Sequence, residues 1–185
     1  MENVFAAESR YCVERSAEEA WLEPARHGQP WALEQFYRGY HEQVYALCFR
    51  LLGRADDAQD AMQTAFMRAF RELPRFRGQS SVKTWIYRIA LNESLGMLRK
   101  RRDGAELDEC QASTSDTGAA VVEQVAVRSA LARLKADHRA VLVLRFWEGL
   151  SYEEIGEVLG ISLAATKMRL SRARDEFRRR YQEAR

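Results

Sequence analysis

Apolar side chains recur every three or four residues over most of the chain, which is the spacing of one buried helix face. In the first half the pattern predicts three helices, over residues 31–54, 56–73 and 82–102. Gly53 and Pro74 are expected to end the first two, because glycine suits the left-handed conformation after a helix and proline cannot continue one. Alternating strand patterns are scarce. The sequence therefore predicts an all-α fold.

A second group of helices is expected from residue 123 onward. Its clearest local signal is a capping box, in which the side chains of Ser151 and Glu154 each accept a hydrogen bond from the other residue's backbone N–H. The helix that this box opens should end at Gly160, and Ser162 should cap a long final helix. The apolar face of the final helix is predicted to consist of Leu163, Thr166, Leu170, Ala173 and Phe177. Two helices joined by so short a turn predict a helix-turn-helix.

Charge is unevenly distributed along the chain, although the formal net charge is only +2. Residues 99–102 read Arg-Lys-Arg-Arg, and the C-terminal stretch is again rich in arginine. Residues 103–122 are instead acidic and rich in Ser, Thr, Gly and Ala, which predicts a flexible linker. A helical extension is the alternative for this segment. Two small helical domains, over residues 31–102 and 123–185, would then flank the linker.

Residues 1–30 are expected to form a flexible N-terminal leader, because Pro24, Gly28 and Pro30 interrupt its later part. The leader lacks the basic start and the apolar run of a signal peptide, and no stretch is long and apolar enough for a membrane span. A cytoplasmic protein is therefore expected. The cysteines are scattered without disulfide or zinc spacing. Cys48 lies in an apolar helical run and is expected to be a buried free thiol.

The helix-turn-helix is the strongest candidate binding site. One side of its second helix offers small residues, which allow close approach to DNA, and long basic donors, which reach base edges and phosphates. The side chains expected to contact duplex DNA are Ser162, Ala164, Ala165, Lys167, Met168, Arg169, Ser171 and Arg172.

A second candidate site lies between residues 76 and 102, where aromatic and basic residues are interleaved. Aromatic faces beside positive charge suit single-stranded DNA and bases taken out of a duplex. The candidate contacts are Arg77, Gln79, Ser80, Lys83, Trp85, Tyr87, Arg88, Asn92, Arg99 and Arg101. For Trp85 a role in the hydrophobic core is favoured over DNA contact.

A third candidate is a polar helix face on which Asp57, Asp60 and Thr64 recur at steps of three and four, with Gln63 beside them. A metal or acid–base site would need a further suitably spaced carboxylate or histidine, so a surface for a partner protein is favoured. The sequence offers no Ser/His/Asp or Cys/His set and no glycine-rich phosphate loop. We therefore expect a protein that is not an enzyme and needs no cofactor, metal or small-molecule substrate.

Three segments resemble motifs of the extracytoplasmic-function sigma factors of the sigma-70 family. Residues 57–66 resemble region 2.2 of that family, and residues 76–92 resemble its regions 2.3 and 2.4. Residues 144–160, together with residues 166–174, resemble its region 4. The resemblance implies a subunit that binds core RNA polymerase and directs it to promoters.

The resemblance also implies a role for each segment. The face that docks on the β′ clamp helices of core RNA polymerase would comprise Asp57, Asp60, Gln63 and Thr64. Residues 76–93 would recognise and help melt the minus-10 promoter element, and residues 162–172 would read the minus-35 element. The polymerase β flap would be a further partner. An anti-sigma factor, often membrane-bound in this family, would hold the protein inactive.

The chain departs from the family pattern at two places. Lys135-Ala136 stands where many members have Leu-Pro, which leaves a helix boundary open. Residues 164–166 read Ala-Ala-Thr in place of a common Gly-Thr-Val, which leaves the preferred minus-35 sequence open.

Two other interpretations compete with the sigma factor. A stand-alone dimeric regulator would bind palindromic duplex DNA without polymerase, but it gives residues 76–93 no purpose. A decoy that only binds an anti-sigma factor would not need the basic face at residues 167–172.

Overall fold

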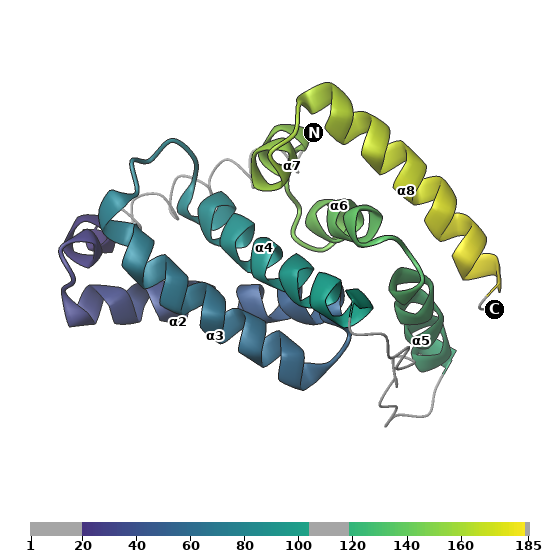
Figure 1. Ribbon diagram of the computed structural model, residues 1–185, viewed down its shortest axis with the longest axis horizontal. Helices are drawn as coiled ribbons and strands as arrows, with labels where there is room; N and C mark the ends of the chain where they lie inside the picture. Colours follow the sequence, from purple (N-terminus) through teal and green to yellow (C-terminus); the bar gives the residue numbers. More distant parts are fainter. Residues whose placement is uncertain (1–19, 104–118, 184–185) are drawn as a thin grey trace.

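The computed structural model describes residues 20–103 and 119–183, and all regular structure in those residues is helical. The prediction of an all-α fold is confirmed (Figure 1). The elements are α2 (Pro30–Leu52), α3 (Ala55–Glu72), the short 3-10 helix η1 (Leu73–Arg75), α4 (Val82–Asp103), α5 (Ala119–Ala132), α6 (Ala136–Phe146), α7 (Tyr152–Leu159) and α8 (Leu163–Glu183).

Local signals in the sequence set the ends of the first two long helices. Pro30 occupies the first turn of α2, where its missing N–H is not needed for the helix, so α2 begins at Pro30 and not at Trp31. Gly53 follows α2 in the left-handed conformation, with φ of 76°, and donates its N–H to the carbonyl of Phe49. Pro74 lies in η1 directly after α3, so the predicted stop is confirmed.

The N-terminal domain is a bundle of α2, α3 and α4 around a cluster of aromatic rings. Phe36 is fully buried at its centre. The ring centroid of Phe36 lies 5.6 Å from that of Phe66 on α3 and 6.2 Å from that of Trp85 on α4. The cluster therefore contains side chains from all three helices. Because aromatic side chains bury a large apolar area, it contributes strongly to the packing of the bundle.

The leader differs from the expectation in its described part. Residues 20–26 are helical, and the ring of Trp21 stacks on Phe36 with centroids 5.5 Å apart. Ala25, one turn after Trp21, is 1% exposed. These two side chains form one apolar face at helical spacing, so the segment packs on the bundle as part of the domain. Residues 1–19 lie outside the described residues.

The C-terminal domain contains α5 to α8, and the helix-turn-helix consists of α7 (Tyr152–Leu159) and α8. The predicted capping box is present: Ser151 N–H donates to the Glu154 carboxylate (2.8 Å), and Glu154 N–H donates to Ser151 Oγ (3.1 Å). Gly160 ends α7 with φ of 66°. Ser162 Oγ accepts from the N–H of Ala165 at 3.2 Å, as an N-cap should.

The buried face of α8 begins one turn later than predicted. Leu163 is 39% exposed, whereas Thr166, Leu170 and Ala173 are buried. Thr166 can be buried because its hydroxyl donates to the carbonyl of Ser162 at 3.1 Å. Leu163 precedes this stripe in the first turn of α8 and remains on the surface.

The boundaries of the linker also differ from the prediction. Helix α4 continues through Asp103, and α5 already begins at Ala119. Residues 119–122, which the prediction placed in the linker, are helical, so the alternative of a helical extension is correct for this end of the segment. Residues 104–118 lie outside the described part of the chain. The open boundary at Lys135 is resolved, because Lys135 directly precedes α6.

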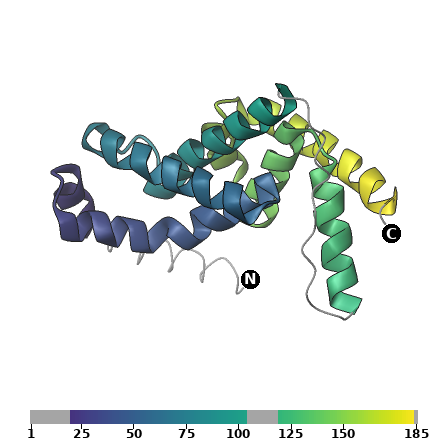
Figure 2. The same cartoon turned by 60° about the horizontal axis from the view of Figure 1, so that its bottom comes forward.

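The two domains pack against each other, with α6 and α7 beside α2 and α4 and with α8 on the outer side (Figures 1 and 2). Helix α6 buries six consecutive residues, from Arg139 to Leu144. A helix that is buried on all sides cannot lie at the edge of one small domain. The N-terminal domain therefore covers the side of α6 that α8 leaves open. None of the helices in the described ranges is long and apolar enough to cross a bilayer.

Gly156 is required by the close approach of α7 to the turn of the helix-turn-helix. A Cβ atom at this position would lie 2.9 Å from the carbonyl oxygen of Ile161 and 3.3 Å from Thr166 Oγ1. We predict that Gly156→Ala lowers the free energy of unfolding by about 1–3 kcal/mol, because the backbone must move. Urea unfolding followed by circular dichroism measures the change.

Gly39 provides the matched control for this prediction. It lies within α2, where an added Cβ would have no other atom within 4 Å. Gly39→Ala should raise the free energy of unfolding by about 0.5–1 kcal/mol, because alanine favours the helix. Equal effects of the two substitutions would contradict the role given to Gly156.

Candidate nucleic-acid and polymerase interfaces

The outer face of α8 presents the side chains predicted to contact duplex DNA. Thr166, Leu170 and Ala173 hold the opposite face in the core. Most of the predicted contacts are exposed, namely Ser162, Ala164, Lys167, Met168, Ser171 and Arg172, while Ala165 and Arg169 are partly buried. The helix thus offers small side chains near its N-terminus and long donors further along, as entry into a major groove requires.

The basic residues of this face differ in the contacts that they make with neighbouring side chains. Arg169 lies 3.8 Å from the carboxylate of Asp137 on α6. The ammonium of Lys167 lies over the ring of Tyr152, 5.9 Å from its centroid. Arg172 is exposed and forms no ion pair with another described residue. Arg172 is therefore the basic side chain of this face that can reach a base edge with the least rearrangement.

The segment from residue 76 to residue 102 divides into an exposed part and a covered part. The exposed candidates are Arg77, Gln79, Arg88, Asn92, Arg99 and Arg101, and the partly buried ones are Ser80, Lys83 and Trp85. Ser81 caps α4, since its Oγ accepts from the N–H of Thr84 at 3.0 Å. This cap fixes the start of α4 directly after the loop that carries Arg77 and Gln79.

Trp85 lies between two other aromatic rings and contributes to the core. Its ring centroid is 5.0 Å from that of Phe76 and 6.2 Å from that of Phe36. Trp85 remains partly exposed, but its packing agrees with the core role that the sequence analysis favoured.

Tyr87 and Lys83 are turned toward the C-terminal domain. Tyr87 is fully buried, and its hydroxyl donates to the carboxylate of Glu148 at 2.7 Å. Lys83 Nζ donates to the main-chain carbonyl of the same Glu148 at 3.3 Å. Burial, and then the adjacent Glu148 carboxylate, raises the pKa of Tyr87, so its hydroxyl stays protonated and able to donate. The structure thus separates these two residues from the exposed DNA candidates.

The polar face of α3 is exposed where the sequence predicts a protein interface. Asp60, Gln63 and Thr64 are exposed. Met67, one turn after Thr64, is 64% exposed and continues the same stripe. Met67 is not among the residues predicted from the sequence, although a methionine at helical spacing from three polar surface residues is a signal for a partner-binding face.

Asp57 is placed differently from the rest of this face. Its side chain is 19% exposed and pairs with Arg101 at the end of α4. Arg54 lies 3.8 Å from the same carboxylate. Asp57 therefore links the start of α3 to the end of α4. The sequence had assigned Asp57 to the polymerase face and Arg101 to the minus-10 surface, and the structure pairs them.

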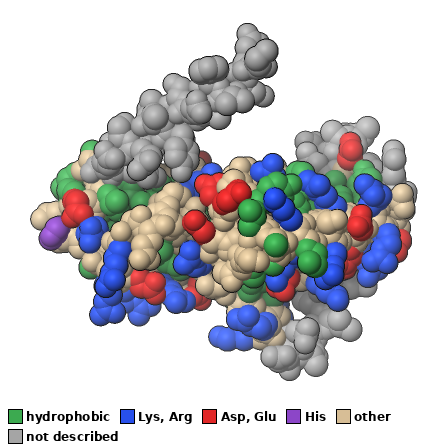
Figure 3. Space-filling model, turned by 90° about the horizontal axis from the view of Figure 1, so that it is seen from above, with side chains coloured by type: hydrophobic (Ala, Val, Ile, Leu, Met, Phe, Trp, Pro, Cys, Tyr) green, Lys and Arg blue, Asp and Glu red, His purple; other side chains and the backbone are tan. Residues whose placement is uncertain are grey.

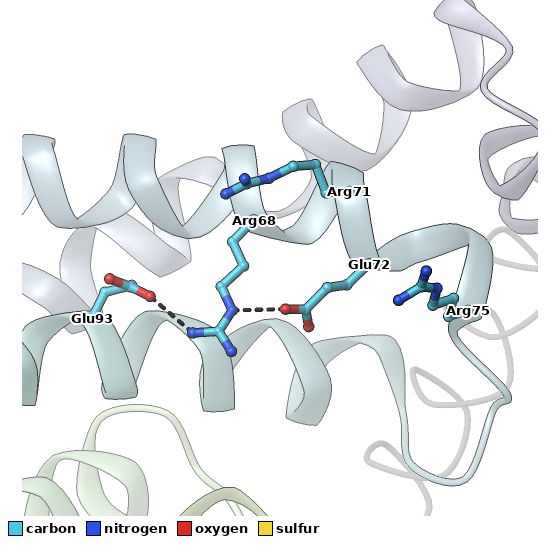
Figure 4. Close-up of a pocket in the computed structure, with 5 residues that line it drawn as sticks. All are labelled: Arg68, Arg71, Glu72, Arg75 and Glu93. Carbon is cyan, nitrogen blue, oxygen red and sulfur yellow. Dashed lines mark hydrogen bonds and ion pairs between the residues drawn. The ribbon is translucent and has the colours of Figure 1, made fainter.

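A polar hollow lies between α3 and α4 and is lined by three arginines and two glutamates (Figure 4). Arg68 donates from Nε to Glu72 at 2.7 Å and from a terminal nitrogen to Glu93 at 3.1 Å. These two carboxylates raise the pKa of Arg68. Arg71 and Arg75 complete the lining. Since Arg68 bridges Glu72 on α3 and Glu93 on α4, it links the two helices.

An apolar groove opens on the C-terminal domain. Its lining consists of Leu131, Leu142, Phe146, Trp147, Arg174, Phe177 and Arg178. Phe146 is 55% exposed and Trp147 is 41% exposed. The guanidinium of Arg174 lies over the Phe146 ring, 5.2 Å from its centroid. Exposed aromatic side chains with basic neighbours suit an amphipathic helix of a partner that carries acidic residues.

Charged groups are spread over the molecular surface in Figure 3, where Lys and Arg side chains lie toward both ends of the face shown and are interspersed with acidic ones. The local faces of α4 and α8 therefore matter more for DNA binding than the small net charge.

Cys48 is a buried free thiol, as predicted. Burial raises its pKa to about 11, so the reactive thiolate is scarce at neutral pH.

Comparison with known proteins places both domains in one family. The family model for sigma-70 region 2 matches residues 36–103, and the model for sigma-70 region 4 matches residues 124–177. RNA polymerase sigma factor YlaC of Bacillus subtilis is 32% identical over 163 residues, which cover 83% of this chain and 94% of YlaC. ECF RNA polymerase sigma factor SigM of Mycobacterium tuberculosis is 34% identical over 155 residues, which cover 82% of this chain and 78% of SigM.

Two solved structures share the fold. Sigma factor RpoE of Bartonella quintana, in complex with the anti-sigma factor NepR, has a TM-score of 0.69 at 26% identity. The match covers 82% of this chain and 98% of RpoE. CnrH, in complex with the cytosolic domain of CnrY, has a TM-score of 0.67 at 28% identity, and the match covers 87% of this chain and 94% of CnrH.

Proposed function

The chain belongs to the extracytoplasmic-function sigma factors of the sigma-70 family, and from this premise we propose how its surfaces divide the work of promoter recognition. It is an RNA polymerase sigma factor, and the family is non-enzymatic. In the proposal α3 binds core polymerase, the segment from residue 76 to residue 102 binds the minus-10 element, and α8 binds the minus-35 element. The observation that carries the proposal is that one chain combines an exposed basic recognition helix with a separate exposed aromatic and basic segment.

The minus-35 role of α8 is supported by its exposed face. Small residues at its start permit close approach to the floor of the major groove, and Lys167, Arg169 and Arg172 supply long donors. Because Arg169 already lies near Asp137, Arg172 is the stronger candidate for a bidentate contact with a base.

The minus-10 role is supported by the exposed residues of the loop and of α4. Arg77 and Gln79 lie in the loop, and Arg88, Asn92 and Arg99 follow on α4. Guanidinium groups can both pair with phosphates and stack on bases that leave the duplex. Tyr87 and Lys83 would join this surface once the C-terminal domain no longer covers them.

The polymerase-binding role of α3 rests on Asp60, Gln63, Thr64 and Met67. Polar residues around an exposed methionine are typical of an interface that forms and dissociates. Asp57 would support this face indirectly, through its pairing with Arg101.

The apolar groove of the C-terminal domain is the proposed site for the β flap of core polymerase. Phe146 and Trp147 would bury their rings against the partner, and Arg174 and Arg178 would face its acidic residues. Among the structural relatives, RpoE is in complex with the anti-sigma factor NepR, and CnrH is in complex with the cytosolic domain of CnrY. An anti-sigma factor for this chain would inhibit it by covering the same groove or the α3 face.

The role of Arg172 leads to a first prediction for DNA binding. Arg172→Ala should weaken binding to a minus-35 duplex by about 1–3 kcal/mol, because a bidentate contact to a base is lost. Fluorescence anisotropy with a duplex taken from a promoter that the protein activates measures this change. Arg179→Ala removes the same charge from the exposed side of α8 two turns later and should have a much smaller effect. Equal losses for the two variants would remove Arg172 from the base contacts.

The role of α3 leads to a prediction for polymerase binding. Asp60→Arg should weaken association with core RNA polymerase at least tenfold, because it reverses a charge at the centre of the proposed interface. Titration of labelled protein with core polymerase gives the dissociation constant, and the melting temperature should remain unchanged because Asp60 is exposed. Glu34→Arg makes the same charge reversal on an exposed site of α2 and serves as control. Wild-type affinity of the Asp60→Arg variant would refute the proposed interface.

A further inference from the structure

The contact between the two domains is centred on one glutamate. Glu148 lies in the turn between α6 and α7, and its side chain is only 6% exposed. Arg50 on α2 donates to one carboxylate oxygen at 2.9 Å. Tyr87 on α4 donates to the other oxygen at 2.7 Å. A buried carboxylate is tolerated only when it is paired in this way, so Glu148 depends on both helices of the N-terminal domain.

The same glutamate also engages Lys83 through its main chain. Lys83 Nζ donates to the Glu148 carbonyl at 3.3 Å and lies over the ring of Tyr87, 5.6 Å from its centroid. Lys83 and Tyr87 therefore face the C-terminal domain. Both belong to the surface proposed for minus-10 DNA. In this arrangement Tyr87 is buried, and the ammonium of the partly buried Lys83 is held by the other domain.

Further contacts hold the domains in the same arrangement. Arg139 on α6 donates to the carbonyl of Leu51 at the end of α2 and to the carbonyl of Ala132 at the end of α5 (2.6 Å). A guanidinium at two helix C-termini is favourably placed, because unpaired carbonyls and the negative end of the helix dipole meet there. Arg128 on α5 lies over the Phe49 ring of α2, 5.7 Å from its centroid.

Two other proposed surfaces remain open while the domains are packed together. Asp60, Gln63 and Thr64 on α3 are exposed. Lys167 and Arg172 on α8 are also exposed. The packing of the domains thus covers part of the minus-10 surface and leaves the polymerase and minus-35 surfaces accessible.

We propose that Glu148 is an interdomain latch that keeps the free protein closed and withholds Lys83 and Tyr87 from minus-10 DNA until the domains separate. The closure is independent of the proposed function, whereas its consequence for promoter DNA rests on the role proposed for residues 76–93. Core polymerase would favour the open state by binding the two domains at separate places, since a partner shifts a conformational equilibrium by its preference for one state.

Once the domains separate, water can solvate Glu148, Arg50 and the hydroxyl of Tyr87, so none of these groups is left buried without a partner.

Hydroxyl-radical footprinting with mass spectrometry tests the latch on the protein alone. In the wild type Tyr87 and Phe36 are both fully buried and should both be protected. Glu148→Ala should raise the oxidation rate of Tyr87 at least fivefold and leave Phe36 protected, because Phe36 belongs to the core of the N-terminal domain. Glu157→Ala removes the same charge from an exposed site on α7 and should behave as the wild type. Unchanged protection of Tyr87 in Glu148→Ala, or an equal rise at Phe36, would overturn the latch.

A charge exchange separates the latch from a general loss of stability. Arg50→Glu alone places two carboxylates together and should expose Tyr87 as Glu148→Ala does. Combining Arg50→Glu with Glu148→Arg restores opposite charges and should restore most of the protection. Failure of the combined variant to protect Tyr87 better than Arg50→Glu would contradict the proposal.

A transcription assay tests whether closure matters for promoters. At limiting protein concentration Glu148→Ala should give at least twofold more transcript than the wild type with core polymerase, because the closed fraction no longer reduces the apparent affinity. Equal or lower yield would show that the latch does not withhold the minus-10 surface. The two experiments separate the latch from the proposed function. If the latch is wrong, promoter-dependent transcription by the wild type is still expected. If the wild type gives no promoter-dependent transcription, the footprint of Tyr87 can still show the latch.

Discussion

A carboxylate that is nearly excluded from water lies where the two halves of this protein meet. Glu148 is 6% exposed, and burial of an unpaired charge would cost several kcal/mol. Arg50 and the hydroxyl of Tyr87 remove that cost, but only if α2 and α4 lie against the turn between α6 and α7. The all-round burial of α6 follows from the same packing. The arrangement of the domains therefore depends on specific polar pairing as well as on apolar area.

The faces left open by this packing suit the roles proposed for them. The cap at Ser162 and the buried stripe beginning at Thr166 hold α8 rigidly, so its basic side faces away from the core. The polar stripe of α3 is exposed on the other domain. A sigma factor must connect polymerase to two separated promoter elements, and surfaces on two linked domains meet that requirement.

Features that depend on neighbouring residues could be predicted from the sequence. The capping box at Ser151 and Glu154, the helix end at Gly53 and the stop at Pro74 each follow from backbone geometry within a few residues. Periodicity also identified the exposed face of α8. The resemblance to sigma factors was carried by the same local motifs, and the comparisons confirm it.

Features that depend on distant residues could not be predicted in this way. Tyr87 looked like a base-stacking residue, but its partner Glu148 is far along the chain and belongs to the other domain. Asp57 fits the polar stripe of α3 by spacing, yet Arg101 draws it toward α4. Trp21 lies in a segment rich in helix breakers, and its ring packs on Phe36 and Tyr40 of α2. Periodicity gives the face of a helix, and tertiary packing decides which partner covers it.

Run-off transcription with core RNA polymerase, with and without this protein, on a pool of genomic promoter fragments tests the central claim most directly. We expect new start sites that depend on the protein and share sequence elements near minus 10 and minus 35. The absence of new transcripts, together with tight binding to palindromic duplex DNA in the absence of polymerase, would contradict it.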